Sequence, residues 1–333
     1  MGFMIGDRVR TVDYHTGGEP FRIVAAPPVT IAGATVAERR VFAIGDAAVD
    51  GLRQVLCHEP RGHADMYGGF IVPPDDAGAQ LGVLFWHKDG FSTACGHGTI
   101  ALGAWAVRSG LVAAPDDGVT DVVIDVPSGR VTARVHTAAG RVTAVDFVSV
   151  PSFVVASSVV VPTSRGPAEV VVSYGGALYA QLPAAAVGLA VRPEDLTALI
   201  ALGREIKAGL ADHPASRHPT DDRLSGIYGV IFHEEADGAR HQRNVTIFAD
   251  GEVDRSPCGS GTAARVATLA EDGTLKAGET LLHESIVGSR FTARFTTAGE
   301  SVLPVITGMA YPTGEHEFVI DPEDPMTPGF VLR

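Results

Sequence analysis

The sequence contains few lysines and no long hydrophobic run, and each shortage excludes a class of protein. Only three of the 333 residues are lysines (Lys88, Lys207 and Lys276), and the formal net charge is −13. An acidic surface repels phosphate groups and anionic lipids, so we expect neither a nucleic-acid partner nor a role at the membrane surface. No stretch reaches the ~20 apolar residues that a transmembrane helix requires.

Cysteines are also scarce. Three cysteines cannot all pair with one another, and two of them stand in matching motifs, so a disulfide framework is not expected. The third, Cys57, is interpreted as a small core residue.

The first ten residues include Asp7, Arg8 and Arg10 and lack the apolar core of a signal peptide. The sequence therefore predicts a cytoplasmic protein.

The rest of the composition is that of a globular protein, with 45% hydrophobic and 20% charged residues. Short segments rich in Val, Ile and Phe, bounded by Gly, Pro or Asp, predict strands in both halves. These strands are expected within residues 22–24, 70–72, 81–85, 122–126, 131–135, 142–147, 151–180, 245–248, 291–295, 305–306 and 318–320, and around Phe232. Fewer helices are expected: after Cys95, after Cys258, and near residues 193–209 and 47–56.

One sequence motif occurs twice. C-G-H-G-T-I-A-L-G-A begins at Cys95 and C-G-S-G-T-A-A-R-V-A at Cys258, and each reaches a glycine fifteen positions after its cysteine. The two cysteines lie 163 residues apart, about half the chain, which favours duplication of a whole domain over a short solenoid repeat. Each Ala-rich run predicts a helix closely enclosed by a sheet. We therefore predict domains at residues 1–155 and 156–333, with the last segment packing back on the first domain and the active site between the two.

The position of each cysteine indicates its chemistry. At the start of a helix, free backbone N–H groups and the helix dipole stabilise a thiolate, so we expect a lowered thiol pKa there. The same N–H groups form a ready site for a carboxylate, and the motif glycines let the backbone turn tightly. Two such helix ends facing each other would hold a carboxylate with one sulfur on each side of its α-carbon. That arrangement suits removal of a proton from one face and delivery to the other.

The neighbours of the cysteines support a paired site. His97 and Asp254 could hold the amine of a bound zwitterion and influence the thiols. Taken singly, His97 is equally interpretable as a helix-end hydrogen-bonding residue and Asp254 as a capping residue. Zinc is a poor fit, because neither motif has the ligand spacing of a tetrahedral site. Covalent catalysis by one Cys–His pair leaves the second motif unexplained, and a non-catalytic amino-acid-binding protein has no need of two activated thiols.

These motifs, with two others, resemble the proline racemase family, which includes proline racemases, hydroxyproline 2-epimerases and trans-3-hydroxy-L-proline dehydratases. The other two are D-Y-H-T-G-G-E-P at Asp13–Pro20 and E-P-R-G-H-A-D-M-Y-G-G at Glu59–Gly69. The resemblance covers nearly the whole chain. It implies an α/β (α+β) fold of two similar diaminopimelate-epimerase-like domains, each a barrel-like, mostly antiparallel sheet around a central helix. It also implies catalysis with no cofactor, neither PLP nor metal, on a small-molecule substrate, and a homodimer as a common assembly.

The resemblance assigns roles to individual residues. Cys95 and Cys258 match the two catalytic cysteines, one a thiolate base and the other a thiol acid in each direction. Four residues would hold the substrate carboxylate through backbone N–H groups: Gly96, His97, Gly259 and Ser260. His97 and Asp254 match residues that contact the ring amine. The two additional motifs are expected to be mainly structure-building turns near the pocket.

Two reactions remain open. The sequences H-K-D-G-F-S-T-A-C-G-H, L-S-G-I-Y-G-V-I-F and I-D-P-E-D-P-M-T-P-G-F resemble the dehydratase branch. Tyr228, a predicted substrate-binding residue, stands where many 4-hydroxyproline epimerases have histidine. Typical dehydratases of that branch have threonine at the second catalytic position, where this chain has Cys258. Since inversion needs a proton donor on the opposite face and elimination does not, we expect a racemase or epimerase, with trans-3-hydroxy-L-proline dehydratase as the alternative.

Overall fold

The structure, a computed structural model, describes residues 8–332, and the chain divides into two compact units. Unit 1 contains the described residues through Ala94, then Gly98–Val145, and the described residues from Met309 on. Unit 2 contains Cys95–His97 and Asp146–Gly308. Most of the residues on which the absence of a signal peptide was predicted, 1–7, lie outside the described residues. Within residues 8–332, no helix combines the length and apolar character needed to cross a membrane.

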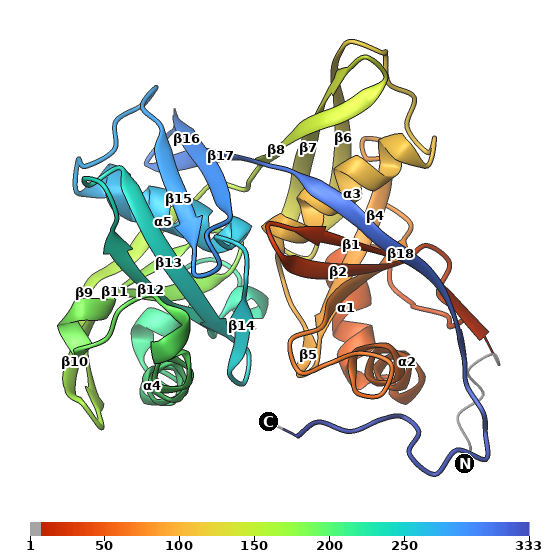
Figure 1. Ribbon diagram of the computed structural model, residues 1–333, viewed down its shortest axis with the longest axis horizontal. Coiled ribbons are helices and arrows are strands. Elements are labelled where there is room, and N and C mark those ends of the chain that lie inside the picture. The colour runs from red at the N-terminus through yellow and green to blue at the C-terminus, as the bar shows by residue number, and fades with distance from the viewer. Residues whose placement is uncertain (1–7, 333) are drawn as a thin grey trace. The chain divides into compact units, whose positions relative to one another are not determined.

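Unit 1 consists of strands and three helices (Figure 1). Its strands are β1 (Arg8–Thr16), β2 (Glu19–Val24), β3 (Tyr67–Val72), β4 (Leu81–His87), β5 (Gly90–Phe91), β6 (Gly118–Val126), β7 (Gly129–Ala138), most of β8 (Arg141–Val148) and β18 (Ala310–Val319). Its helices are α1 (Val36–Gly45), α2 (Ala47–Cys57) and nearly all of α3 (Gly96–Arg108). The hairpin between β1 and β2 turns at Gly17 and Gly18, whose φ angles of 60° and 95° favour glycine.

The strands of unit 1 are mostly antiparallel. β1 pairs antiparallel with β18 and β2, β2 parallel with β3, and β3 antiparallel with β4. β4 pairs antiparallel with the short β5 and parallel with β6, which in turn pairs antiparallel with β7. Helix α3 packs closely on this sheet, because a Cβ at Gly103 would lie 2.6 Å from the Cβ of Ala133 on β7.

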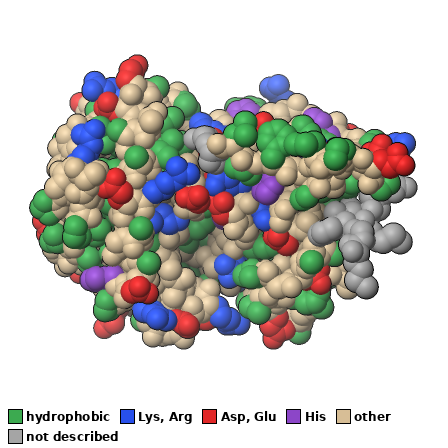
Figure 2. Space-filling view, turned by 90° about the horizontal axis from the view of Figure 1, so that it is seen from below, with side chains coloured by type: hydrophobic (Ala, Val, Ile, Leu, Met, Phe, Trp, Pro, Cys, Tyr) green, Lys and Arg blue, Asp and Glu red, His purple; other side chains and the backbone are tan. Residues whose placement is uncertain are grey.

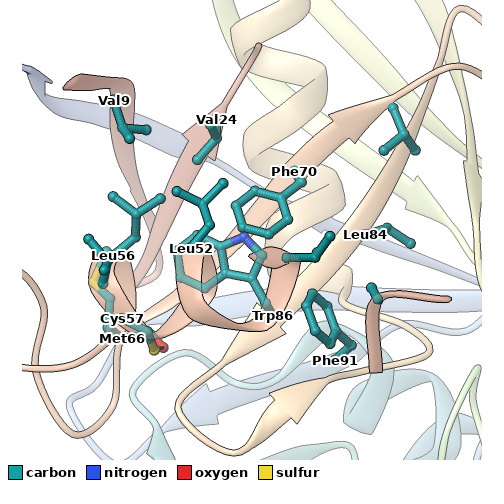
Figure 3. Close-up of a cluster of buried hydrophobic side chains, with 14 of the residues drawn as sticks. Val9, Val24, Leu52, Leu56, Cys57, Met66, Phe70, Leu84, Trp86 and Phe91 are labelled. Atoms are coloured by element: carbon teal, nitrogen blue, oxygen red, sulfur yellow. Dashed lines mark hydrogen bonds between the residues drawn. The ribbon is translucent and has the colours of Figure 1, made fainter. Parts of the chain in front are cut away.

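A core cluster of unit 1 surrounds Trp86 of β4 (Figure 3). The Phe70 ring lies 5.5 Å from the Trp86 ring and 6.4 Å from that of Phe91, centroid to centroid. Leu52 of α2 is fully buried in the same cluster. Cys57, at the end of α2, is also fully buried there, and its thiol donates to the carbonyl of Met66 at 3.2 Å. The interpretation of Cys57 as a core residue is confirmed.

A buried ion pair connects the two additional motifs within unit 1. Arg22 on β2 donates to Asp13 at 2.8 Å, and neither side chain is more than 9% exposed. The same guanidinium donates to the carbonyls of Leu56 and Arg61, at 2.6 and 2.8 Å. Gly62 in the second motif fits only as glycine, since a Cβ there would overlap a backbone carbonyl of α2. Breaking such a buried pair by removing one partner costs about 3–5 kcal/mol, so these motifs hold β1, β2 and α2 together.

Unit 2 repeats this arrangement (Figure 1). Its strands are β9 (Phe153–Thr163), β10 (Gly166–Tyr174), β11 (Leu178–Pro183), β12 (Ile227–Glu235), β13 (His241–Phe248), β14 (Glu252–Asp254), β15 (Leu281–Ser285), β16 (Arg290–Ala298) and β17 (Ser301–Gly308). Its helices are α4 (Leu196–Gly209), α5 (Gly259–Glu271) and four single-turn 3₁₀ segments, Ala184–Val187, Pro193–Asp195, Pro214–Ser216 and Asp222–Leu224.

Each pairing of unit 2 has a counterpart in unit 1. β10 pairs antiparallel with β9 and β11, β11 parallel with β12, and β12 antiparallel with β13. β13 pairs antiparallel with the short β14 and parallel with β15, and β15, β16 and β17 continue antiparallel. Helix α5 contacts β9, β10, β11, β16 and β17, so the strands surround it. The duplicated sequence phrase thus marks a duplicated topology, with α3 and α5 in equivalent places.

Each half of the chain ends with a strand, β9 or β18, that pairs within the other unit. β9 follows β8 directly in the chain but pairs with β10, and β18 follows β17 but pairs with β1. The chain therefore leaves unit 1 at Val145, within β8, and returns to unit 1 at Met309. Residues 155 and 156, between which the sequence predicts the domain boundary, lie within β9.

The strand segments and the four helices expected from the sequence are present, the helices as α2, α3, α4 and α5. Helix α1 was missed, although its start carries a capping box: Thr35 accepts from the Glu38 N–H, and Glu38 reaches back to the Thr35 N–H. On the face shown in Figure 2, basic side chains are interspersed with acidic ones.

Candidate active site

The two motif cysteines immediately precede helices, as the sequence predicted. α3 begins at Gly96 and α5 at Gly259, and Cys258 is the N-cap of α5. Both cysteines are reduced and buried, Cys95 being 4% and Cys258 5% exposed. Cys95–His97 belong to unit 2 although the remainder of α3 belongs to unit 1. Both motifs are therefore represented within unit 2.

The starts of the two motifs touch through their glycines. A Cβ built on Gly96 would lie 2.5 Å from the Cα of Gly259 and 2.7 Å from the backbone nitrogen of Ser260. A Cβ on Gly259 would lie 2.5 Å from the Cα of Gly96 and 2.9 Å from the nitrogen of His97. Real Cβ atoms do not tolerate such distances, so both positions require glycine. The first N–H groups of a helix lack intrahelical acceptors, and here two such sets lie together.

His97 stands between the first thiol and a buried carboxylate. Its Nδ1 and Nε2 lie 3.4 and 3.5 Å from the Cys95 sulfur, so the sulfur is almost equally distant from the two nitrogens. The same Nδ1 lies 4.0 Å from Oδ2 of Asp254, and both side chains are 4% exposed. The structure thus brings together three predicted site residues from distant parts of the sequence.

Asp254 connects to the backbone of the second cysteine through Ser256, a residue that was not predicted from the sequence. The Ser256 N–H and hydroxyl both donate to Asp254 Oδ1, at 2.8 and 2.7 Å. The Cys258 N–H donates to the Ser256 hydroxyl at 3.0 Å. Since Oδ1 is occupied by these two bonds, Oδ2 is the oxygen directed at His97. The D-R-S-P-C sequence is therefore one hydrogen-bonded turn that positions the carboxylate and the cysteine together.

Two tyrosines pack around Cys258. The fully buried Tyr179 has its hydroxyl 2.7 Å from the Ser260 hydroxyl and 3.9 Å from the Cys258 sulfur. Tyr228, partly buried, packs against the cluster that contains Cys258 and Tyr179, and its ring meets that of Tyr179 edge to face at 5.8 Å. Tyr179 was missed because nothing in the sequence near β11 marks it. It reaches the motif because α5 packs against β11 in the folded unit.

The pKa of Cys258 differs from the sequence expectation. Burial raises the pKa of the Cys258 thiol well above its ordinary value, and the negative charge of Asp254 raises it further. The Gly261 N–H and the Thr246 hydroxyl act in the opposite direction but are outweighed. The prediction that the helix start lowers the pKa of this thiol was therefore wrong, because removal from water outweighs the effect of the helix terminus. Cys258 is a protonated thiol near neutral pH.

The side chains of this site do not form a compact metal-binding cluster. Cys95, His97, Asp254 and Cys258 are all residue types that ligate metals. Among residues 8–332, however, these four do not supply three ligand atoms that all lie within 4.8 Å of one another. The site instead contains groups suited to acid–base chemistry: two thiols, an imidazole, a carboxylate and two helix starts.

The chain resembles known proteins over nearly its whole length. Residues 11–331 match the family model described as proline racemase. A trans-3-hydroxy-L-proline dehydratase from Bacillus thuringiensis subsp. konkukian is 42% identical over 328 residues, 97% of each chain. A 3-hydroxyproline 2-epimerase from Burkholderia multivorans is 41% identical over 338 residues, 99% of each chain. The crystal structure of a hydroxyproline epimerase from Agrobacterium vitis with bound trans-4-hydroxy-L-proline superposes with a TM-score of 0.91 at 30% identity, covering 100% of this chain and 97% of the other. The mixed, mostly antiparallel fold expected from the sequence is confirmed.

Proposed function

The chain belongs to the proline racemase family, and on that premise we propose that it inverts the α-carbon of proline or a hydroxyproline without a cofactor, using Cys95 and Cys258. The observation that carries this proposal is the pair of buried cysteines at helix starts whose next residues, Gly96 and Gly259, are in backbone contact. A single nucleophilic cysteine would not require the second motif to meet the first.

The helix starts supply the binding site for the substrate carboxylate in this proposal. The N–H groups of Gly96, His97, Gly259 and Ser260 belong to two first turns that lie against each other. Backbone N–H groups and the positive ends of two helix dipoles favour a carboxylate there. The ring amine, positively charged, then binds at Asp254 Oδ2 next to His97.

In this proposal the protonation states of the two thiols determine which one removes the α-proton and which one donates a proton. In one direction Cys95, as a thiolate, removes the α-proton, and the Cys258 thiol donates its proton to the opposite face of the planar intermediate. The raised pKa of Cys258 keeps that proton in place until it is needed. In the reverse direction the roles exchange. A substrate ammonium at Asp254 neutralises the negative charge that helps to raise the Cys258 pKa, which makes the thiolate accessible for the reverse step.

Dehydration of trans-3-hydroxy-L-proline is the second candidate, favoured by the 42% identity to a relative of that name. The same base would take the α-proton, and the 3-hydroxyl would leave as water with that same proton, without a contribution from the second thiol. The product would be Δ1-pyrroline-2-carboxylate. Elimination needs one base at the α-carbon and no donor on its opposite face, so Cys258 favours inversion as the main activity.

The test is a side-by-side assay in D₂O with L-proline, trans-4-hydroxy-L-proline and trans-3-hydroxy-L-proline. Epimerisation predicts α-deuterated product of inverted configuration, measured by chiral chromatography and mass spectrometry. Dehydration predicts a ketimine that an NADPH-dependent reductase consumes. Failure of all three substrates to exchange their α-proton would overturn the proposal. As a control for the site, pyrrole-2-carboxylate, a planar analogue of the deprotonated ring, should protect both cysteines from iodoacetamide.

A further inference from the structure

The backbone at Cys258 is strained. Its φ and ψ are 64° and 105°, a region that residues with a Cβ rarely adopt. Among the described residues, the only other non-glycine residues with positive φ are Ala139 and Ala249. Glycine would remove the strain at position 258 but would also remove the thiol. The surrounding structure must therefore hold this conformation in place.

Hydrogen bonds fix the two peptide groups on either side of the Cys258 Cα. In the preceding peptide, the Pro257 carbonyl accepts from Asn244 Nδ2 at 3.2 Å and from the Thr262 hydroxyl at 3.1 Å. The Cys258 N–H of that peptide donates to Ser256. In the following peptide, the Cys258 carbonyl accepts from the Thr262 N–H at 2.7 Å. Rotation about φ or ψ would swing one of these peptide planes and break its bonds.

The two donors to Pro257 are themselves oriented. Asn244 also donates to the Glu284 carbonyl at 3.2 Å, so both N–H groups of its amide face carbonyl oxygens. The Thr262 hydroxyl lies 2.8 Å from His283 Nδ1. Burial lowers the pKa of His283 to about 3, so its ring is neutral and carries one proton. Since Thr262 gives its hydrogen to Pro257, that proton belongs on Nδ1, where it donates to Thr262. Nε2, buried and unpaired, is then a bare acceptor.

The held conformation sets the direction of the thiol. A Cβ on Gly261 would lie 2.8 Å from the Cys258 sulfur and 3.1 Å from its Cβ, so the side chain rests over this glycine. Asn244 and Thr262 are 0% exposed, and His283 is 0% exposed as well. Asn244 and Thr262 bond to the backbone of Pro257 and Cys258, and His283 bonds to Thr262.

We infer that Asn244, Thr262 and His283 form a positioning group, the Pro257 clamp, that holds Cys258 in its strained conformation and so aims the thiol. This inference depends on the proposed function in one respect only, namely that Cys258 acts as an acid–base group. It deepens that proposal by naming three residues that act through the cysteine without touching substrate.

The test uses the full-length chain and the matched variants Thr262→Val and Thr262→Ser. Valine keeps the shape but loses the hydroxyl, and serine keeps the hydroxyl. Thr262→Val should lower kcat at least about tenfold with KM changed less than about threefold, and Thr262→Ser should restore kcat to within about threefold of the unmodified enzyme. Iodoacetamide labelling, followed by peptide mass spectrometry, should show a changed rate at Cys258 relative to Cys95 only in Thr262→Val. Unchanged kcat together with an unchanged labelling ratio in this variant would overturn the clamp.

Two further variant sets keep the inference decidable if Thr262→Val does not fold or if no substrate turns over. Asn244→Ser removes the other side-chain donor to Pro257 and should shift the Cys258 labelling ratio in the same way. Cys258→Gly should have a higher Tm than Cys258→Ala, because only glycine is unstrained at this φ. An equal or higher Tm for Cys258→Ala would show that no strain is held there. These readouts do not depend on catalysis, so the clamp and the proposed function fail separately.

Discussion

Gly96 and Gly259 approach so closely that a Cβ on either would lie 2.5 Å from the Cα of the other. This contact joins the two copies of a motif separated by about half the chain. Neither glycine has a positive φ, so neither is required for a turn. Both are required because backbone meets backbone, and the two sets of helix-start N–H groups come together as a result.

Substituting Gly259 with alanine should therefore damage the site by displacement. Overpacking costs about 1–3 kcal/mol of stability, and a shift of about 1 Å at the reacting centre lowers kcat/KM about 100-fold. Gly45→Ala is the matched control, because nothing lies within 4 Å of a Cβ at Gly45. Steady-state kinetics and urea unfolding measure both effects. Wild-type kcat/KM in Gly259→Ala would contradict the close approach.

Tyr179→Phe should weaken the site moderately. The change removes the hydroxyl that lies 2.7 Å from Ser260 and 3.9 Å from the Cys258 sulfur. Loss of one hydrogen bond costs about 0.5–1.5 kcal/mol, so we expect kcat/KM to fall about threefold to tenfold. Tyr311→Phe, which alters an exposed tyrosine of unit 1, should have no effect. Equal kinetics for both variants would show that the Tyr179 hydroxyl has no part in the site.

The raised pKa of Cys258 predicts the pH dependence of its alkylation. Only the thiolate reacts, so the rate at Cys258 in the ligand-free enzyme should still be rising above pH 9. Asp254→Asn removes the negative charge that adds to the effect of burial, and should increase the rate at any given pH. Peptide mass spectrometry after timed iodoacetamide treatment gives the rate at each cysteine. A plateau for Cys258 below pH 8 would refute the raised pKa.

His283 should make the fold sensitive to acid. Burial lowers the pKa of His283 to about 3, against 6.5 in the unfolded chain. Between these values the unfolded chain binds a proton that the folded chain does not, so stability falls as the pH falls below 6.5, by at most about 1.4 kcal/mol per pH unit. Above pH 6.5 the residue contributes no slope. Urea unfolding from pH 7 to 4 should show a shallower loss in His283→Asn, and an identical slope would contradict the assignment.

The sequence was sufficient to predict the features that depend on local pattern. The repeated Cys-Gly-x-Gly-Thr phrase located α3 and α5 and placed Cys95 and Cys258 at their starts. Tyr179, Asn244 and His283 could not be found in this way, because they reach the motif through strand pairing and helix packing and carry no signal of their own. Burial decided the pKa of Cys258 against the local effect of the helix start, and burial is a property of the whole fold. The placement of β9 and β18 likewise depends on pairing between distant strands.

In the proposed mechanism inversion requires a thiol on each side of the α-carbon, and the variant Cys258→Ser removes one of the two thiols. The measurement is the rate of deuterium incorporation and of inversion in D₂O, with the substrate that the unmodified enzyme turns over best. Because a serine hydroxyl is a far weaker acid than a thiol, inversion should fall at least about 1,000-fold. Elimination from trans-3-hydroxy-L-proline, if it occurs, should persist. Inversion by Cys258→Ser at the rate of the unmodified enzyme would contradict the two-thiol mechanism.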